Sequence, residues 1–348
     1  MPISNGRYVS PTWINNQAPP INAPELQAIT DTLQSLDGIG GSGRGYIIVG
    51  TTQSGATLST CDYLCDGTAD DVEINQAIQT ALLKNLDVLL LDGLYKISSP
   101  IFPTQNIFLC GQAYGTNASS GYSTPNSVTL SFDSSTESSM IKIQNSSNVI
   151  HLSNLTLDSS VPCSLIDFGQ VFTGTLYMDN VKMTQQDDVT GIVGPTNSFE
   201  LYANESTLYS STLSFSASRI EKCLLYNLSF LECGALGQGT DSFFSFNTFY
   251  GNSVMTDCQK CTLIGNIFYG SLSLQSGSGS ATNHVCACNN IIGNTFAAGN
   301  GITLGTGTSY NNVTCNGGVA YQGGTSFTHW SGVTDNGTNN YVANNMPT

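Results

Sequence analysis

The chain has 348 residues, of which 40% are hydrophobic and only 9% are charged, and its formal net charge is −15 at pH 7. This acidic balance argues against nucleic acid and anionic lipid surfaces as partners, because both would repel the protein. Ser, Thr and Asn number 42, 37 and 32, beside 36 Gly. Such a composition lacks the Ala, Glu, Lys and Leu of a coiled coil or helical bundle, so we expect an all-β solenoid, sandwich or barrel.

Membrane and export signals are not visible in the sequence. No apolar run reaches the length of a membrane-spanning helix, and the first residues show neither the basic nor the apolar region of a signal peptide. The sequence therefore predicts no membrane insertion and gives no support to secretion by the general pathway.

Residues 1–45 differ in pattern from the rest of the chain. The segment from Asn22 to Glu25 has the spacing of a helix capping box. Apolar residues then recur at helical spacing, at Leu26, Ile29, Leu33 and Leu36. A flexible Gly-rich joint follows at 38–45. This helix either packs on the body of its own chain or forms a short coiled seam between subunits.

A second helix is predicted over 68–84. Thr68 to Asp71 again has capping-box spacing, and Ile74, Ile78 and Leu82 line one face of the segment. An apolar run at 88–91, an Asp-Gly turn and a second run at 95–97 predict two strands directly after this helix.

An irregular repeat occupies the chain after residue 100. Seven asparagines begin short apolar segments and lie between 19 and 28 residues apart, at Asn154, Asn180, Asn204, Asn227, Asn247, Asn266 and Asn294. Periods of this size indicate a solenoid, with one coil per repeat and Asn at a bend. An apolar residue three positions before the last four of these asparagines predicts an inward position, at Leu224, Phe244, Leu263 and Ile291.

The segment CDYLCDGTADDVEINQAI at 61–78, followed by DVLLLDGLYKISSPI at 87–101, resembles the opening of the pectate-lyase-like right-handed parallel β-helix superfamily. In that superfamily a DGTxDD segment starts a helix that covers the open end of the coil stack. The first residues, NGRYVSPTWINNQAPPINAPEL, resemble start segments of bacteriophage tail and tail-fibre proteins. The resemblance implies an all-β, single-stranded right-handed parallel β-helix over 46–348, with an N-terminal capping helix. It also implies that 1–45 serves as a virion-attachment or oligomerisation segment, and that the protein is a homotrimer.

Catalytic motifs are incomplete. Asp187-Asp188 and Arg219-Ile-Glu-Lys222 resemble two parts of the polygalacturonase pattern, but no histidine lies between them. Counting six residues back from three of the asparagines predicts one outward column of Glu221, Asp241 and Lys260. The two carboxylates would then lie roughly 5 Å apart, near the separation found in retaining glycosidases. Glu221 and Asp241 are therefore the candidate catalytic pair, and a surface salt-bridge ladder is the simpler interpretation.

Eleven cysteines include two close pairs, Cys258 with Cys261 and Cys286 with Cys288. The second pair is too closely spaced for an ordinary zinc site, and no histidine completes a tetrad. We expect buried reduced thiols, with no metal and no cofactor.

These observations favour a phage tail spike or tail appendage protein that contacts host surface polysaccharide, in a receptor-binding or structural role. Its other partners would be tail or baseplate proteins held by the N-terminal segment, and its location the virion, after assembly in the host cytoplasm and release by lysis. A glycoside hydrolase or polysaccharide lyase of the same fold, acting on a neutral or amino-sugar polymer, is the first alternative. A bacterial β-helix adhesin is the second.

Overall fold

A computed structural model describes residues 3–4, 7–8, 45–103, 106–112, 128–134, 136–143, 149–168, 174–184, 190–193, 199–209, 213–226, 231–233, 242–256, 258–276, 286–297, 300–319 and 332–345. The chain divides into two compact units, Met1–Tyr46 and Ile47–Thr348. In the first, β1 (Ile3–Ser4) and β2 (Arg7–Tyr8) form an antiparallel pair. The helix predicted from Leu26 to Leu36 lies outside the described residues.

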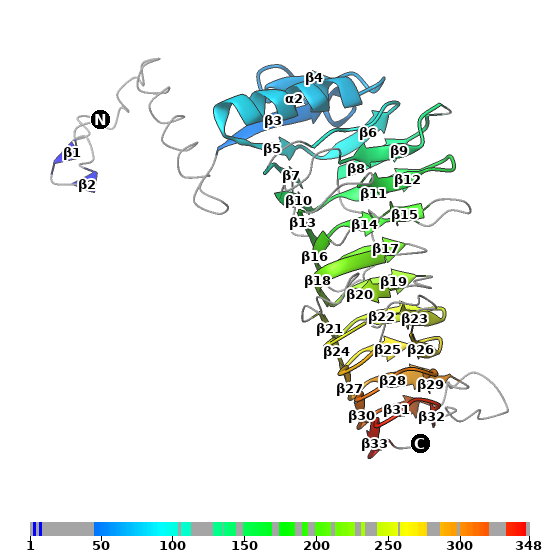
Figure 1. Ribbon diagram of the computed structural model, residues 1–348. Coiled ribbons are helices and arrows are strands. Elements are labelled where there is room, and N and C mark those ends of the chain that lie inside the picture. Colours follow the sequence, from blue (N-terminus) through cyan, green and yellow to red (C-terminus); the bar gives the residue numbers. More distant parts are fainter. Residues whose placement is uncertain are drawn as a thin grey trace. The chain divides into compact units, whose positions relative to one another are not determined.

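The second unit is a parallel β-helix, as predicted. Its strands form three stacks, and most of the coils take one strand from each stack (Figure 1). The first stack contains β3 (Tyr46–Thr51), β4 (Tyr63–Cys65), β5 (Asp87–Leu90), β7 (Phe108–Gly111), β10 (Val149–Ser153), β13 (Thr175–Asp179), β16 (Phe199–Asn204), β18 (Leu213–Glu221), β21 (Phe243–Ser245), β24 (Thr262–Ile264), β27 (Asn290–Ile292), β30 (Asn312–Thr314) and β33 (Tyr341–Ala343).

The other two stacks complete each coil. The second contains β6 (Gly93–Ile97), β8 (Val128–Phe132), β11 (Thr156–Ser159), β14 (Lys182–Met183), β17 (Thr207–Tyr209), β19 (Leu224–Tyr226), β22 (Thr248–Tyr250), β25 (Ile267–Phe268), β28 (Thr295–Ala297) and β31 (Gly317–Val319). The third contains β9 (Ser139–Lys142), β12 (Ser164–Asp167), β15 (Thr190–Val193), β20 (Leu231–Cys233), β23 (Ser253–Thr256), β26 (Leu272–Gln275), β29 (Gly301–Leu304) and β32 (Gly332–Asp335). A single-turn helix, η1 (Thr52–Ser54), follows β3.

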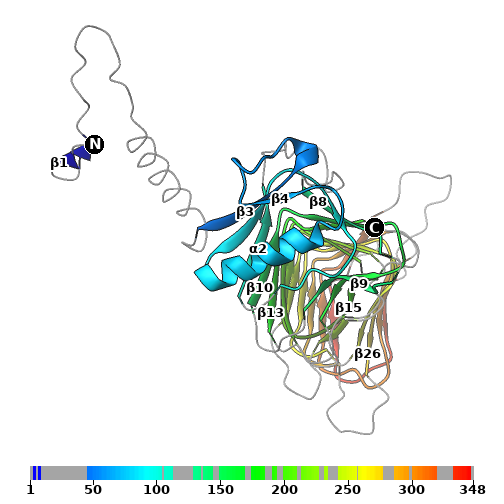
Figure 2. The same cartoon turned by 90° about the horizontal axis from the view of Figure 1, so that it is seen from above.

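The helix α2 (Asp71–Lys84) covers one end of the coil stack, where the edges of the first strands would otherwise be open (Figure 2). It buries Ile74, Ala77, Ile78 and Ala81 completely. The predicted capping box at Thr68 is wrong, because the helix begins at Asp71 and Asp70 makes no side-chain cap. Instead, the buried Asp70 carboxylate accepts hydrogen bonds from the backbone N–H groups of Gly67 and Lys96, both at 2.8 Å. Asp70 thus ties the helix to the first coils.

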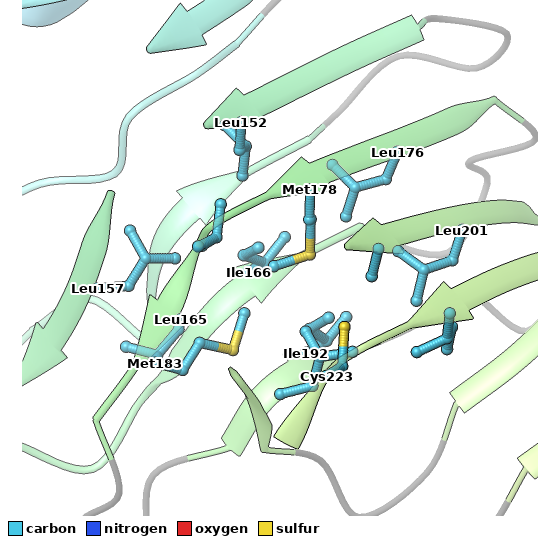
Figure 3. Close-up of a cluster of buried hydrophobic side chains, with 14 of the residues drawn as sticks. Leu152, Leu157, Leu165, Ile166, Leu176, Met178, Met183, Ile192, Leu201 and Cys223 are labelled. Atoms are coloured by element: carbon cyan, nitrogen blue, oxygen red, sulfur yellow. The ribbon is translucent and has the colours of Figure 1, made fainter. Parts of the chain in front are cut away.

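Inward side chains of all three stacks fill the interior, as Figure 3 shows for Leu152, Leu157 and Leu165. Like residues follow one another along the stack axis. The rings of Phe249, Phe268 and Phe296 lie 4.4 and 4.8 Å apart with nearly parallel planes. Offset or parallel aromatic contacts of this kind add stabilisation beyond the burial of area.

Asparagines also stack inside the coils. In the first asparagine ladder each backbone N–H donates to the Oδ1 of the next member, at 2.9 to 3.0 Å. Each side-chain Nδ2 donates to the same Oδ1 and to a backbone carbonyl. The members are Asn247, Asn266, Asn294, Asn316 and Asn345. A second ladder at another corner joins Asn289, Asn311 and Asn340. Both ladders satisfy backbone groups that a buried bend would otherwise leave without partners.

The predicted equivalence of seven asparagines is correct in part. Asn247, Asn266 and Asn294 occupy equivalent positions in successive coils. Asn154 and Asn180 are equivalent to each other. They lie one residue before the position of the first group, where the backbone takes a left-handed conformation. Asn204 lies in β16, opposite Asp179.

Between the coils of β19 and β22 the predicted register is wrong, because Leu224 pairs with Thr248. Cys223 therefore takes the place that Asn247 has in the next coil. The inward partner of Phe244 is Ile220 and not Leu224. Asn227 lies outside the described residues.

Candidate functional site

The outward face of the first stack carries a column of aromatic side chains. Strand pairing aligns Phe108, His151, Tyr177 and Tyr202 in successive coils. The imidazole of His151 stacks on Tyr177 with centroids 4.3 Å apart, and Tyr177 stacks on Tyr202 at 4.8 Å. Since each ring covers the faces of its neighbours, this column presents ring edges and hydroxyl groups to solvent.

The aromatic column continues with Arg219, which pairs with Tyr202 on one side and Phe243 on the other. Its guanidinium lies 5.8 Å from the Phe243 ring centroid, within the range of a cation–π contact. The Arg219 side chain is 60% exposed. It is therefore a cationic donor at the surface of an otherwise acidic protein.

A polar column runs two residues along the same strands and so lies on the same outward face. It contains Ser153, Asp179, Asn204, Glu221 and Ser245 in successive coils. Asn204 Nδ2 donates to Asp179 Oδ1 at 2.8 Å. Glu221 Oε1 accepts from Arg219 at 3.1 Å and from Ser245 Oγ at 3.0 Å. The carboxylates are therefore held in fixed orientations while Asp179 stays exposed.

Three groups of this surface have shifted acidities. Burial alone would raise the pKa of Glu221, but hydrogen bonds from Arg219 and Ser245 outweigh it and leave that pKa below its ordinary value. Glu221 is thus an acceptor at neutral pH and is not suited to donate a proton. Burial lowers the pKa of His151, so its imidazole is neutral at neutral pH. Burial, with the nearby Glu200 carboxylate, raises the pKa of Tyr202, which keeps its hydroxyl proton.

The structure corrects the predicted column of Glu221, Asp241 and Lys260. Glu221 does face outward, but Ser245 pairs with it in the next coil and Ile264 follows. The prediction failed because it counted back from Asn227, whose register with Asn247 is wrong. Lys260 lies at a left-handed corner instead.

Other candidates from the sequence fall on residues that the structure does not describe. These are Asp187, Asp188 and Asp241. The catalytic role of Glu221 and Asp241 stays a prediction. Asp179, Tyr177 and Tyr202 escaped the sequence analysis, although one aromatic residue at the same strand position in two successive repeats was a usable signal.

The second stack carries an outward tyrosine ladder, formed by Tyr209, Tyr226, Tyr250 and Tyr269. Adjacent ring centroids lie 4.5, 4.5 and 5.0 Å apart, with planes within 19° of parallel. Burial raises the pKa values of Tyr209 and Tyr250. The ladder presents a row of hydroxyl groups, of which those of Tyr209 and Tyr250 keep their protons in ordinary buffers.

Most sulfur atoms lie in the interior. Seven of the ten cysteines with described side chains are buried, whereas Cys288 and Cys315 are exposed. The ligand atoms of Cys65, Asp70 and Glu73 lie within 4.8 Å of one another beneath α2. Burial and the nearby carboxylates raise the pKa of the Cys65 thiol in this cluster. Because Asp70 already accepts two backbone hydrogen bonds, this cluster is built to hold the helix.

In the part of the chain that the structure describes, no helix is long and apolar enough to cross a membrane. No protein-family model matches the sequence, and no curated protein does.

Solved structures similar to this chain include two with the same parallel β-helix fold. One is AlyGC, a PL6 family alginate lyase, with 11% identity and a TM-score of 0.42 over 78% of this chain and 38% of that chain. The other is tailspike protein 3 of bacteriophage CBA120, with 13% identity and a TM-score of 0.42 over 79% of this chain and 54% of that chain. The chain therefore covers less than two thirds of either protein.

Proposed function

We propose that this β-helix contacts a bacterial surface polysaccharide through the outward face of its first stack, as a receptor-binding or structural component of a phage tail appendage. The observation that carries the proposal is the pair of adjacent columns on that face. One offers aromatic edges, hydroxyls and the Arg219 guanidinium, and the other offers carboxylate and amide oxygens fixed by hydrogen bonds. Sugar hydroxyls need donors and acceptors of this kind close to apolar surface.

The repeat of the fold suits a polymer. Successive coils present equivalent side chains at intervals of about 4.8 Å. An extended glycan lying along the stack axis would meet the same kinds of group several times, so that weak contacts add up. The negative charge of the protein favours polymers without many anionic groups.

Residues 1–45 would join the protein to other tail or baseplate proteins and support a homotrimer in the virion. This part of the proposal rests on the resemblance of the start segment to phage tail proteins. The similarity of the fold to a phage tailspike is compatible with it.

Binding is tested by incubating the full chain with a panel of purified bacterial surface polysaccharides and measuring retention. We expect saturable binding to at least one polymer, weakened by Arg219→Ala and Asp179→Ala. Binding to none of the polymers, or binding that neither substitution affects, would contradict the proposal.

A glycan-cleaving enzyme is the second candidate, because Glu221 is an ionised carboxylate held by two donors on the same face. Such a group could act as a nucleophile or a base. Release of oligosaccharides from a bound polymer, abolished by Glu221→Gln or Asp241→Asn while binding persists, would establish cleavage by this pair. Binding without release supports the non-enzymatic function, which we favour. Full activity in the double amide variant would exclude the pair.

A further inference from the structure

Three exposed apolar side chains lie together where the first stack turns into the second. Phe246, Ile267 and Tyr269 are 67%, 41% and 47% exposed. The Phe246 ring covers Gly265 of the next coil, where an added methyl group would lie 2.9 Å from the Phe246 ring. From Gly265 the same coil continues through Ile267 to Tyr269, whose side chains face outward. We call Phe246, Ile267 and Tyr269 the apolar strip.

The strip ends in an open aromatic ring. Tyr269 is the last ring of the tyrosine ladder, and one of its faces stacks on Tyr250 at 5.0 Å with planes 2° apart. Its other face is directed at the following coil, where Thr295 pairs with Ile267. Two residues further on stands Ala297, in the position that continues the tyrosine column. Among the residues that the structure describes, a small side chain there leaves this face of the ring uncovered, in agreement with the 47% exposure of Tyr269.

The next coil forms a floor of small residues beside the strip. A methyl group added at Gly293 would meet nothing within 4 Å, so the corner next to Gly265 is open space. The surface over Gly293, Thr295 and Ala297 is therefore lower than the surface of the preceding coil, and the aromatic rings of the strip border it. Gly293 adopts a left-handed backbone conformation, which also makes a larger residue unfavourable at this corner.

The size of the strip favours a small ring over a protein partner. The four steps from Gly265 to Tyr269 span about 13 Å, and the two coils that carry the strip are together about 10 Å wide. The resulting area is of the order of 100 Å², far below the roughly 800 Å² that each partner contributes to a stable protein interface. It has the length of two or three sugar rings.

The chemistry of the strip favours an uncharged sugar. Neither the strip nor its floor carries a charged side chain. The residue before Phe246 in the corner column is Lys222, and its ammonium is paired with Glu205 at 3.3 Å. Aromatic rings accept the apolar C–H face of a pyranose, while a hydroxyl at the ring edge takes its polar rim.

We propose that the apolar strip is a binding site for neutral pyranose rings, with the uncovered face of Tyr269 as the stacking platform and Phe246 as a second contact. This deepens the proposed glycan-contacting function by naming a second surface and the class of sugar it takes. It stands on the geometry of the second stack, and so can be tested separately from the first.

Saturation-transfer NMR on the full chain with the methyl pyranosides of glucose, galactose and mannose tests the site. We expect binding of at least one, at a dissociation constant that Tyr269→Ala raises about tenfold or more and that Phe246→Ala also raises. Tyr269→Phe keeps the ring and should change it less than threefold. Tyr341→Ala removes a tyrosine that is 61% exposed outside the strip and serves as the matched control. Circular-dichroism melting establishes that each variant is folded.

Binding of none of the three pyranosides, or binding that both alanine variants leave unchanged, would overturn the strip as a sugar site. The polysaccharide assay on the same preparations separates this failure from failure of the proposed function. If wild-type protein retains a polymer but binds no methyl pyranoside at the strip, only this inference is contradicted. If wild-type protein binds a methyl pyranoside through Tyr269 but retains no polymer, the strip stands as a sugar site and the proposed function of the first stack is contradicted.

Discussion

Asn266 in the first asparagine ladder offers a direct test of how the coils are held together. Its Oδ1 accepts from the backbone N–H of Asn247 at 2.9 Å and from Asn247 Nδ2 at 3.0 Å. Its Nδ2 donates to Phe244 O at 3.0 Å and to Asn294 Oδ1 at 2.9 Å. The side chain is completely buried. Asn266→Ala therefore removes four hydrogen bonds from the interior of the protein.

The cost follows from what each partner retains. Asn247 Nδ2 keeps Ile220 O, and Asn294 Oδ1 keeps the backbone N–H of residue 266. The backbone N–H of Asn247 loses its acceptor in a buried site, which costs about 1–3 kcal/mol, and the other bonds are worth about 1 kcal/mol each. We expect Asn266→Ala to lower the free energy of unfolding by about 4–6 kcal/mol. Asn266→Ser should cost about 2 kcal/mol less, because Ser206 at the same corner accepts from Val181 N–H through its hydroxyl.

Urea unfolding followed by circular dichroism measures both variants. Asn336→Ala is the matched control, since Asn336 is exposed, and should stay within about 0.5 kcal/mol of wild type. The reasoning is refuted if Asn266→Ala behaves like Asn336→Ala, or if the serine variant is no more stable than the alanine variant.

Three further predictions concern other parts of the molecule. Burial lowers the pKa of His151 in the folded state, so its contribution to stability is complete above the unfolded pKa of about 6.5 and is lost as the pH falls below it. The melting temperature of His151→Phe should therefore depend less on pH between 7 and 5 than that of wild type, and an equal dependence would refute this. Cys288 and Cys315 should react with a thiol reagent in the native protein, whereas Cys258, which is fully buried, should react only after unfolding. Equal reaction rates of the three thiols in the native protein would contradict the fold. Deleting residues 1–45 should leave the far-UV β signal intact, because α2 keeps its place over the coils, and loss of the signal would show that the segment packs into the core.

The sequence indicated the fold class and the covering helix because both depend on local patterns. The apolar stripe through Ile74 and Ile78 marks a helix face whatever lies around it. Periodic apolar segments likewise indicate a solenoid without any knowledge of the loops. Where asparagine itself occupies the corner, as at Asn247, Asn266 and Asn294, the register was also correct, although the spacings are 19 and 28 residues.

The register failed where the residue at a corner changes but its role does not. Cys223 and Ser206 stand in the column that Asn247 continues, and their side chains accept backbone N–H bonds as asparagine does. A repeat defined by asparagine alone aligns Asn227 with Asn247, whereas Cys223 is the residue at that corner. The error moved Asp241 into a column that Ser245 occupies. A search by hydrogen-bond acceptor and not by residue identity would have found the corner.

Capping was misread for a similar reason. Thr68 and Asp71 have the spacing of a capping box, but the Asp70 carboxylate accepts hydrogen bonds from the backbone of Gly67 and Lys96 and does not cap the helix. The bond from Lys96 joins residues 26 positions apart, so local spacing gives no sign of it. The outward columns of Tyr177 and Tyr202 depend in the same way on strand pairing over distances that vary from coil to coil.

The proposed function depends on contact between a glycan and the outward face of the first stack. Calorimetric titration of a retained polysaccharide against wild type, Arg219→Ala and Asp179→Ala measures this most directly, with Gln275→Ala on the third stack as control. Each of the two substitutions should weaken binding about tenfold, or about 1.4 kcal/mol, while Gln275→Ala leaves the affinity unchanged. Equal affinity in all four proteins would contradict the account.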